Sequence, residues 1–385
     1  MKKNVLLLAY TKKNVGDDLF ISMLLYKYPN VDFTIRNIEE NYDEPFKIYK
    51  NFKNKIDKET ILTLDVTDYN AIIYIGGSVF SETEKNLKKQ KNLSELAKKC
   101  KKNKIPFYYI SSNFGPYKTE EYLEACKETY KNITGITFRD QTSYNMFKRI
   151  KSVKYASDMV YSLEIKNKKR IKNSIGISVI HLNFKSRNEI LKEADGKYAK
   201  ELSNKIVNFI KDGKKIYLFS FCKYEGDEVG IKKITDTLPD EYKSKINIVK
   251  YNGKPGNLID FIKKYSIMEM FICTRFHSII LSMLYKQKIL IMSYNQKINN
   301  LLKDFENEYK IIEINKNLDL SKIKYSDFKD ISDRTLQNII ESSKKHFIEL
   351  DKVLGKTKKR AKINGLPITK RIRRKISKII KRFVK

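Results

Sequence analysis

The feature that most constrains the fold is an alternation of apolar, β-rich runs with helical patterns along the chain. Such alternation is typical of parallel sheets built from strand-helix-strand units. In the N-terminal half it predicts strands at residues 5–10, 71–75, 105–110, 135–138 and 153–156. In the C-terminal half it predicts strands at 175–180, 216–221, 246–249, 270–273, 289–292 and 311–314, and a long helix near 333–353.

A polar, charged stretch, KNKKRIKN at residues 166–173, separates the two halves and is interpreted as an interdomain linker. We therefore predict an α/β protein with two Rossmann-like domains, at residues 1–165 and 174–354, the second ending in a closing helix, and then a basic tail at 355–385. A chain of 385 residues with 41% hydrophobic content can bury two ordinary cores.

The opening MKKNVLLLAY resembles a signal peptide, but its apolar run is about six residues long and ends before Lys12 and Lys13. We interpret it as the first strand. The four cysteines show no CxxC pairing, which favours reduced thiols in a cytosolic protein and no zinc site. They are Cys100, Cys126, Cys222 and Cys273.

The formal charge of +34 comes mostly from lysine scattered along the chain. No zinc-finger spacing, RNP-type aromatic motif or helix-turn-helix pattern accompanies it, so nucleic-acid binding is not the expected main function.

The tail from Gly355 to Lys385 differs in composition, with fourteen Lys or Arg and no Asp or Glu. Its apolar residues recur at helical spacing: Ile368, Ile372, Ile376, Ile379 and Phe383. A basic amphipathic helix of this kind predicts peripheral contact with an anionic membrane surface. A solvated basic tail and nucleic-acid contact are the alternatives.

The densest cluster of candidate site residues follows the predicted strand at 270–273. Arg275, His277 and Ser278 lie where that strand gives way to a helix, and Lys297 follows the next strand. Loops at the carboxyl ends of parallel strands are where open α/β sheets hold ligands. Arginine offers a permanent planar cation, and histidine can pass a proton near neutral pH, so this pair suits a small anionic substrate.

Two glycine-containing loops in the first half follow predicted strands in the same way. In the loop with Asn14, Gly16 and Asp17, either Asp17 or Asp18 is expected to cap the next helix, leaving the other for sugar hydroxyls or base catalysis. Gly76, Gly77 and Ser78 either form a tight turn or offer free amides to a ligand at a helix start. Arg139 and Asp158 are further candidates, with salt bridging as the alternative.

The order of these motifs resembles that of the polysaccharide pyruvyl transferase family. The matching segments are Asn14-Val15-Gly16-Asp17-Asp18, Ile75-Gly76-Gly77-Ser78, Phe114-Gly115-Pro116, Phe138-Arg139-Asp140 with Ser143, Ser157-Asp158, Arg275-Phe276-His277-Ser278, and Ser293-Tyr294 with Lys297. The resemblance runs from about residue 4 to about residue 305. Phe276 departs from it, since leucine is more usual there.

The resemblance implies a GT-B type fold and transfer of the enolpyruvyl unit of phosphoenolpyruvate to two hydroxyls of one sugar. It also implies that the domain at residues 1–165 faces the acceptor and the domain at 174–354 faces phosphoenolpyruvate. In that scheme Arg275 binds the donor, aided by Arg139, Lys185, Arg187 or Lys223. His277 protonates the methylene, and Asp17 or Asp158 receives a hydroxyl proton. No metal or cofactor is needed. The acceptor would belong to a cell-surface polysaccharide or its lipid-linked precursor, made on the cytosolic face of the membrane. A nucleotide-sugar glycosyltransferase and a catalytically silent scaffold are the alternatives.

Overall fold

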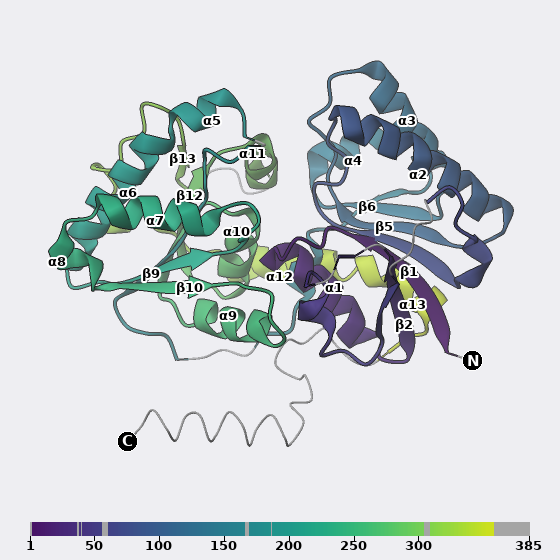
Figure 1. Cartoon of the computed structure of the whole chain (residues 1–385), viewed down its shortest axis with the longest axis horizontal. Helices are drawn as coiled ribbons and strands as arrows, with labels where there is room; N and C mark the ends of the chain where they lie inside the picture. Colours follow the sequence, from purple (N-terminus) through teal and green to yellow (C-terminus); the bar gives the residue numbers. More distant parts are fainter. Residues whose placement is uncertain are drawn as a thin grey trace.

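The computed structural model describes residues 2–36, 38–39, 41–55, 61–165, 169–185, 187–303 and 309–357. Figure 1 shows two α/β domains side by side, each built on one parallel sheet. This confirms the predicted fold class. The tail helix predicted beyond residue 357 lies outside the described residues, as do residues 166–168 of the predicted linker.

The first sheet has the strand order β3-β2-β1-β4-β5-β6-β7, and every pair is parallel. Its strands are β1 (Lys3–Ala9), β2 (Val31–Arg36), β3 (Phe52–Lys55), β4 (Ala71–Ile75), β5 (Phe107–Ser112), β6 (Gly135–Phe138) and β7 (Val153–Tyr155). Strands β4 and β5 are buried throughout, as expected of central parallel strands covered on both faces.

The crossovers of this sheet are α1 (Val15–Lys27), α2 (Glu84–Lys102), α3 (Glu120–Asn132) and α4 (Gln141–Phe147), with short 3-10 turns η1 (Glu44–Phe46), η2 (Val66–Asp68) and η3 (Met159–Ser162). Helix α1 is apolar on nearly all sides. It is buried because the first sheet covers one side and the second domain another.

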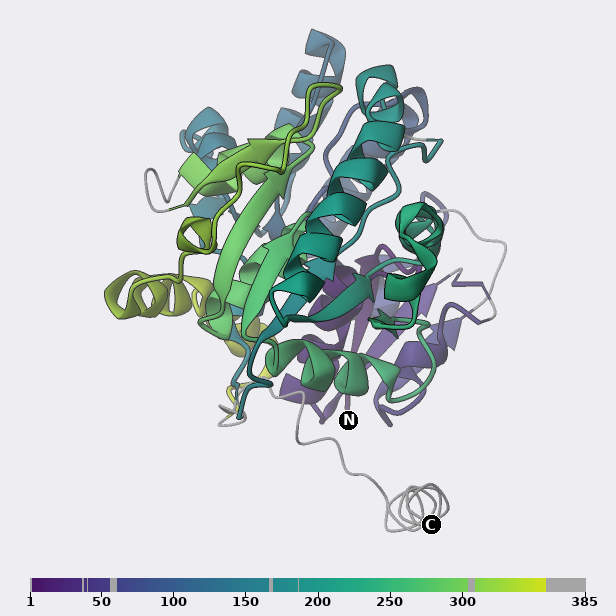
Figure 2. The same cartoon turned by 90° about the vertical axis from the view of Figure 1, so that its left-hand side faces the viewer.

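The second sheet has the order β10-β9-β8-β11-β12-β13, again parallel throughout. Its strands are β8 (Ser174–Ser178), β9 (Lys215–Ser220), β10 (Ile246–Lys250), β11 (Met270–Cys273), β12 (Lys288–Ser293) and β13 (Ile311–Glu313). Its helices are α5 (Glu189–Glu193), α6 (Asp195–Lys211), α7 (Asp227–Thr237), α8 (Asp240–Lys243), α9 (Asn257–Ser266), α10 (Phe276–Leu284) and α11 (Gln296–Lys303), with the turn η4 (Tyr325–Asp327). Figure 2 shows this domain in front of the first.

The two domains are joined by hydrogen bonds beside the start of α1. Asn14 forms an isolated antiparallel bridge with Cys222, and Val15 N donates to the carbonyl of Phe221 at 3.1 Å. The hydroxyl of Tyr251 donates to Asp18 Oδ2 at 2.6 Å, and both side chains are buried. These contacts hold the loop after β1 against the second sheet.

After completing the second sheet, the chain returns to the first domain. The segment predicted as one long helix forms two, α12 (Asp333–Ser343) and α13 (His346–Leu354). Helix α13 packs on the first sheet rather than closing the second domain: Thr137 Oγ1 lies 2.7 Å from His346 Nδ1, and Tyr28 OH donates to Asp351 at 2.8 Å. The apolar spacing is continuous through the break, so the sequence does not reveal the change of direction.

Across the described ranges, the helices fall short of the length and apolar content that a membrane span requires.

Candidate active site

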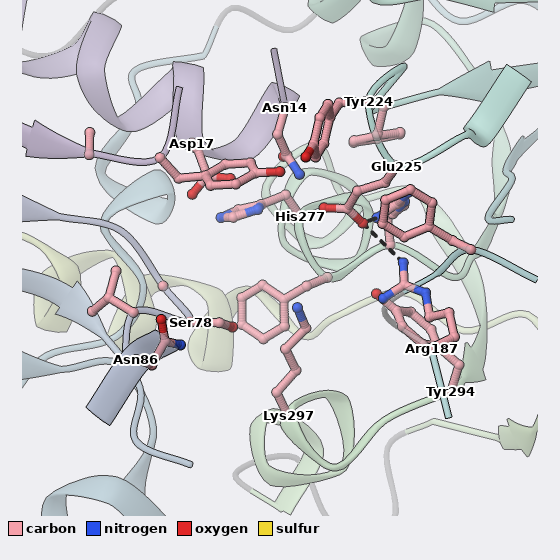
Figure 3. A pocket seen from close by; sticks show the side chains of 18 of the residues that line it. Asn14, Asp17, Ser78, Asn86, Arg187, Tyr224, Glu225, His277, Tyr294 and Lys297 are labelled. Atoms are coloured by element: carbon pink, nitrogen blue, oxygen red, sulfur yellow. Dashed lines mark hydrogen bonds and ion pairs between the residues drawn. The ribbon is translucent and has the colours of Figure 1, made fainter. Parts of the chain in front are cut away.

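Each sheet reverses its strand order at one point, between β1 and β4 in the first and between β8 and β11 in the second. Loops at the carboxyl ends of strands beside such a point form ligand sites in open α/β sheets. A cavity of about 500 Å³ lies where these loops meet, and its lining comes from both domains (Figure 3). It is therefore the candidate active site.

Asn14 ends the loop after β1 and caps α1, since its Oδ1 accepts a hydrogen bond from Gly16 N at 3.0 Å. The prediction that Asp17 or Asp18 caps this helix is wrong, because both lie within the first turn. Their negative charges still favour the helix dipole there. With Asp18 bound to Tyr251, Asp17 is the carboxyl of this loop that lines the cavity.

His277 packs directly against Gly16. A Cβ added at Gly16 would lie 1.7 Å from His277 Nδ1, so a glycine is required for the ring to sit here. The imidazole also meets Phe20 edge to face, with centroids 5.1 Å apart. Its Nε2 lies 3.8 Å from Asp158 Oδ2 and has no hydrogen-bond partner within the described part of the chain. The ring is fixed by packing rather than by hydrogen bonds.

The surroundings of His277 disfavour its charged form. Burial lowers the pKa of His277 well below its usual value, and the cations Arg139 and Lys297 lower it further. The predicted role of His277 as proton donor requires the charged imidazolium. The surroundings favour the uncharged ring instead.

The pKa of Asp17 is raised, whereas that of His277 is lowered. Burial raises the pKa of Asp17 from 3.8 to about 7, although Arg139 pulls it down, and Glu225 raises it further. Among the described residues its side chain accepts no hydrogen bond. A carboxyl with a pKa near 7 can accept or donate a proton at neutral pH, as general acid-base catalysis requires.

Arg139 lines the cavity from the loop that follows β6. It donates to Asp158 Oδ2 and to Asn113 Oδ1, both at 2.8 Å, and its guanidinium carbon lies 3.9 Å from the centroid of the Phe276 ring. A Cβ at Gly77 would lie 2.2 Å from its NH2. The salt-bridge alternative for Arg139 and Asp158 is thus correct, and Arg139 also borders the cavity.

The Gly76-Gly77-Ser78 turn follows β4 but does not start a helix, because α2 begins only at Glu84. This corrects the expectation of amides at a helix start. Gly76 has a φ of 152°, which favours glycine, and Ser78 Oγ lies 3.3 Å from Asn113 Oδ1. Gly77 and Ser78 line the cavity.

Arg275 lies at the cavity wall with its charge already paired. Its Nε donates to Asp227 Oδ2 at 3.2 Å, its NH2 pairs with Asp227 Oδ1, and its NH1 pairs with Glu225 Oε2. The guanidinium is therefore not the free cation that the sequence analysis expected. The neighbouring Ser278 is fully buried and hydrogen-bonded to Ser178 Oγ at 2.9 Å.

The cations available to an anionic ligand are lysines. Lys297 and Lys185 line the cavity and form no ion pair within the described part of the chain. Lys89 also lines it and donates to Tyr74 OH at 2.5 Å. In Figure 3 the Lys297 side chain points into the cavity between the two domains. The chain offers no cluster of three His, Cys, Asp or Glu suited to a metal ion, as far as its described residues reach.

Most of the predicted site residues come together in this cavity. Those that line it are Asn14, Asp17, Gly77, Ser78, Arg139, Arg275, His277 and Lys297. The remaining four are absent from its lining: Gly16, Gly76, Asp158 and Ser278. Of these, Asp158 lines a second cavity, which Arg139 also borders. Of the extra cations considered, Lys185 and Arg187 line the cavity, whereas Lys223 is absent from its lining.

The cavity is also lined by Glu225, Tyr224 and Tyr10, which were not among the predicted site residues. Glu225 and Tyr224 follow the predicted strand at 216–221, so their position after a parallel strand was an available signal. The acidic partner of Arg275 behind the wall, Asp227, had no such signal, because it opens helix α7 like an ordinary first-turn residue.

Comparison with known proteins gives one family. The sequence profile of the polysaccharide pyruvyl transferase family matches residues 14–296. No curated protein matches the chain.

Among solved structures, S. aureus MnaA bound to UDP is similar at 11% identity, with 92% of this chain and 90% of that one covered and a TM-score of 0.51. Anabaena HepE in complex with UDP and glucose is similar at 10% identity, with 98% and 100% covered and a TM-score of 0.50. At these identities the likeness concerns the fold alone, which is of the GT-B type.

Proposed function

Because this chain belongs to the polysaccharide pyruvyl transferase family, we propose that it transfers the enolpyruvyl unit of phosphoenolpyruvate to a sugar and forms a cyclic pyruvate ketal. The observation that carries the proposal is the cavity between the domains. It combines two lysines that form no ion pair with any described residue, Lys185 and Lys297, with His277 and with a carboxyl, Asp17, whose pKa is about 7. This set matches a compact polyanionic donor whose reaction moves protons at neutral pH.

The donor would bind at the cationic part of the cavity. Lys297 attracts the phosphate or carboxylate and lies close enough to lower the pKa of His277. Arg139 adds a second positive centre beside the same ring. The paired Arg275 is left to hold Glu225 in place, which revises its expected role as the donor's own ligand.

Proton transfer would begin at His277. A phosphate dianion bound beside the imidazole offsets the nearby cations and raises its pKa, so that the ring can carry the proton that the methylene carbon takes up. Protonation makes C2 electron-poor, and a sugar hydroxyl attacks it. Asp17 accepts the proton of that hydroxyl as general base.

The second sugar hydroxyl then displaces phosphate from C2 and closes the ketal. Its proton leaves with the phosphate. The proton that Asp17 took from the first hydroxyl returns through solvent to His277 and replaces the proton given to the methyl group. Atoms and charge therefore balance over the whole reaction. Asp158 keeps both oxygens engaged, with Arg139 and with Val160 N, and serves to position Arg139 and the imidazole.

The second candidate is a glycosyltransferase that uses a nucleotide sugar. It is supported by the fold shared with S. aureus MnaA and Anabaena HepE, whose structures contain UDP. Family membership favours the pyruvyl transferase.

A donor assay separates the two. The purified protein is offered phosphoenolpyruvate or UDP-sugars together with saccharide acceptors, and released phosphate and UDP are measured. The proposal expects acceptor-dependent phosphate release from phosphoenolpyruvate and no UDP release. UDP release alone favours the glycosyltransferase, and turnover of neither donor favours the scaffold.

We also propose that the tail at 355–385, most of which lies outside the described residues, binds anionic membrane and brings the cavity to a lipid-linked acceptor on the inner face of the cell membrane. The support is its basic, amphipathic sequence, with about 1 kcal/mol from each cation near an anionic surface.

Sedimentation with vesicles tests the tail. The full chain should pellet with phosphatidylserine-containing vesicles and be released by high salt, while a chain ending at Leu354 should stay in the supernatant. Equal behaviour of the two chains would remove the membrane role. Neutral phosphatidylcholine vesicles serve as the control.

A further inference from the structure

The two oxygens of Glu225 are used unequally. Arg187 NH2 donates to Oε2 at 3.0 Å, and Arg275 NH1 donates to the same Oε2 at 2.5 Å (Figure 3). Oε1 receives no hydrogen bond from the described residues. Since Glu225 lines the cavity, one oxygen is committed to the protein while the other is available to a ligand.

The charge around Glu225 is balanced. Arg275 and Arg187 face two carboxylates, Glu225 and the buried Asp227. The two guanidinium groups lower the pKa of Glu225 to about 2, so it stays ionised at any working pH. A free carboxylate oxygen repels a polyanion and attracts hydroxyl groups. This part of the cavity is therefore suited to a neutral polyhydroxyl partner, in contrast to the lysine-lined part that suits the donor.

An aromatic surface lies next to this carboxylate. Tyr224 is 42% exposed and lines the cavity, and its ring centroid is 6.2 Å from that of Phe184. A cation lies over one face of each of the two tyrosines: Lys12 Nζ is 5.6 Å from the Tyr224 ring centroid, and the Arg187 guanidinium is closer to Tyr294, at 5.0 Å. Tyr294 is also the more buried of the two, so Tyr224 offers more ring surface to a ligand. An exposed aromatic ring beside a hydroxyl-binding oxygen is a combination that suits a sugar ring, which has an apolar face and polar edges.

We propose that Glu225 and Tyr224 form the acceptor subsite: Glu225 Oε1 accepts hydrogen bonds from hydroxyls of a pyranose, and Tyr224 packs against the C–H face of its ring. This inference rests on the proposed function, because it identifies which part of the cavity receives the sugar. It departs from the expected division of acceptor and donor between the domains, because Tyr224 and Glu225 follow β9 of the second sheet. Glu225 orients the hydroxyls and is not itself the base. That role stays with Asp17, whose pKa of about 7 suits a general base.

Kinetics of Glu225→Gln test the assignment, with Glu228→Gln as the matched control. Glu228 lies three residues further on, in the first turn of α7; it pairs with Lys250 at 2.7 Å and is not part of the cavity lining. For Glu225→Gln we expect the KM of the acceptor to rise about tenfold or more, the usual worth of a hydrogen bond to a charged group. The KM of phosphoenolpyruvate should stay the same or fall, because a negative charge is removed.

The control variant should leave both KM values unchanged. If Glu225→Gln raises both KM values equally, the residue serves only to hold Arg275, and the subsite assignment is overturned. An unchanged acceptor KM overturns it as well.

A binding measurement keeps this inference separate from the pyruvyl transfer itself. Saturation-transfer NMR on the protein without donor uses methyl hexopyranosides as probes. We expect transfer to the ring protons that is lost in Glu225→Gln and in Tyr224→Ala but kept in Glu228→Gln. If this pattern is seen while phosphoenolpyruvate is not turned over, the subsite stands and the proposed reaction fails. No transfer in the unmodified protein, or equal transfer in all variants, overturns the subsite.

Discussion

Replacing Asp17 by Asn should make the protein more stable above neutral pH while removing its activity. A pKa raised from 3.8 to about 7 means that the folded state binds the proton more tightly than the unfolded state. Below about pH 4 both states are protonated and nothing is lost. As the pH rises to 7, the wild-type protein must hold an ionised carboxylate in a site that disfavours it, so stability falls across this window.

The full shift corresponds to about 4 kcal/mol. Because the side chain is half-buried and borders the cavity, we take about half of that, about 2 kcal/mol, as the gain expected for Asp17→Asn at pH 8. At pH 4.5 the same substitution should raise the free energy of unfolding by only about 0.5 kcal/mol. At that pH the carboxyl of the folded protein is still protonated, so little of the cost of a buried charge is present.

Thermal unfolding of the two proteins at both pH values measures the difference. At pH 8 the variant should melt several degrees higher, and the gap should close at pH 4.5. A variant that is less stable at pH 8, or a gap that does not depend on pH, would refute the reasoning. In the activity assay the variant should lose the base and with it the rise in turnover expected as the pH passes 7.

Three further substitutions test other parts of the site. His277→Ala should lower turnover by about two to four orders of magnitude while leaving phosphoenolpyruvate binding, measured by calorimetry, mostly intact. Gly16→Ala should displace the imidazole and lower turnover with the fold kept in circular dichroism, whereas Gly196→Ala, where a Cβ has open space, should not; equal activity of the two would mean that the ring position is unimportant. Tyr251→Phe should cost about 1 to 3 kcal/mol in chemical unfolding, because it leaves Asp18 buried without its hydroxyl donor, and a neutral result would mean that this interdomain bond contributes nothing.

The strands that carry the site could be predicted from sequence because they are central and apolar. Runs such as 71–75 and 270–273 are buried on both faces, so their hydrophobicity is continuous. Strands β2 and β3 were missed. In β3 the residues are FKNK, because an edge strand needs little apolar surface, and β2 has a short alternating pattern, VDFTIR.

The residues of the site could be predicted from sequence, but their ion pairing and protonation could not. The order of the motifs indicated that Asp17, Arg139 and His277 belong to one site, and all three line the same cavity. It did not reveal that Arg275 is neutralised by Asp227 and Glu225, because ion pairing depends on side chains from a separate loop. The charged form predicted for His277 was wrong for the same reason. The pKa of a side chain is set by burial and by neighbours that are distant in sequence.

The most direct test of the central claim follows the carbon that is transferred. Phosphoenolpyruvate labelled with ¹³C at C2 is incubated with the protein and a saccharide acceptor, and the product is examined by NMR. The account predicts one quaternary ketal carbon bearing the label, bonded to two oxygens of the same sugar, for each phosphate released. Phosphate release without label on the sugar, or a sugar product formed only from UDP-sugars, would contradict it.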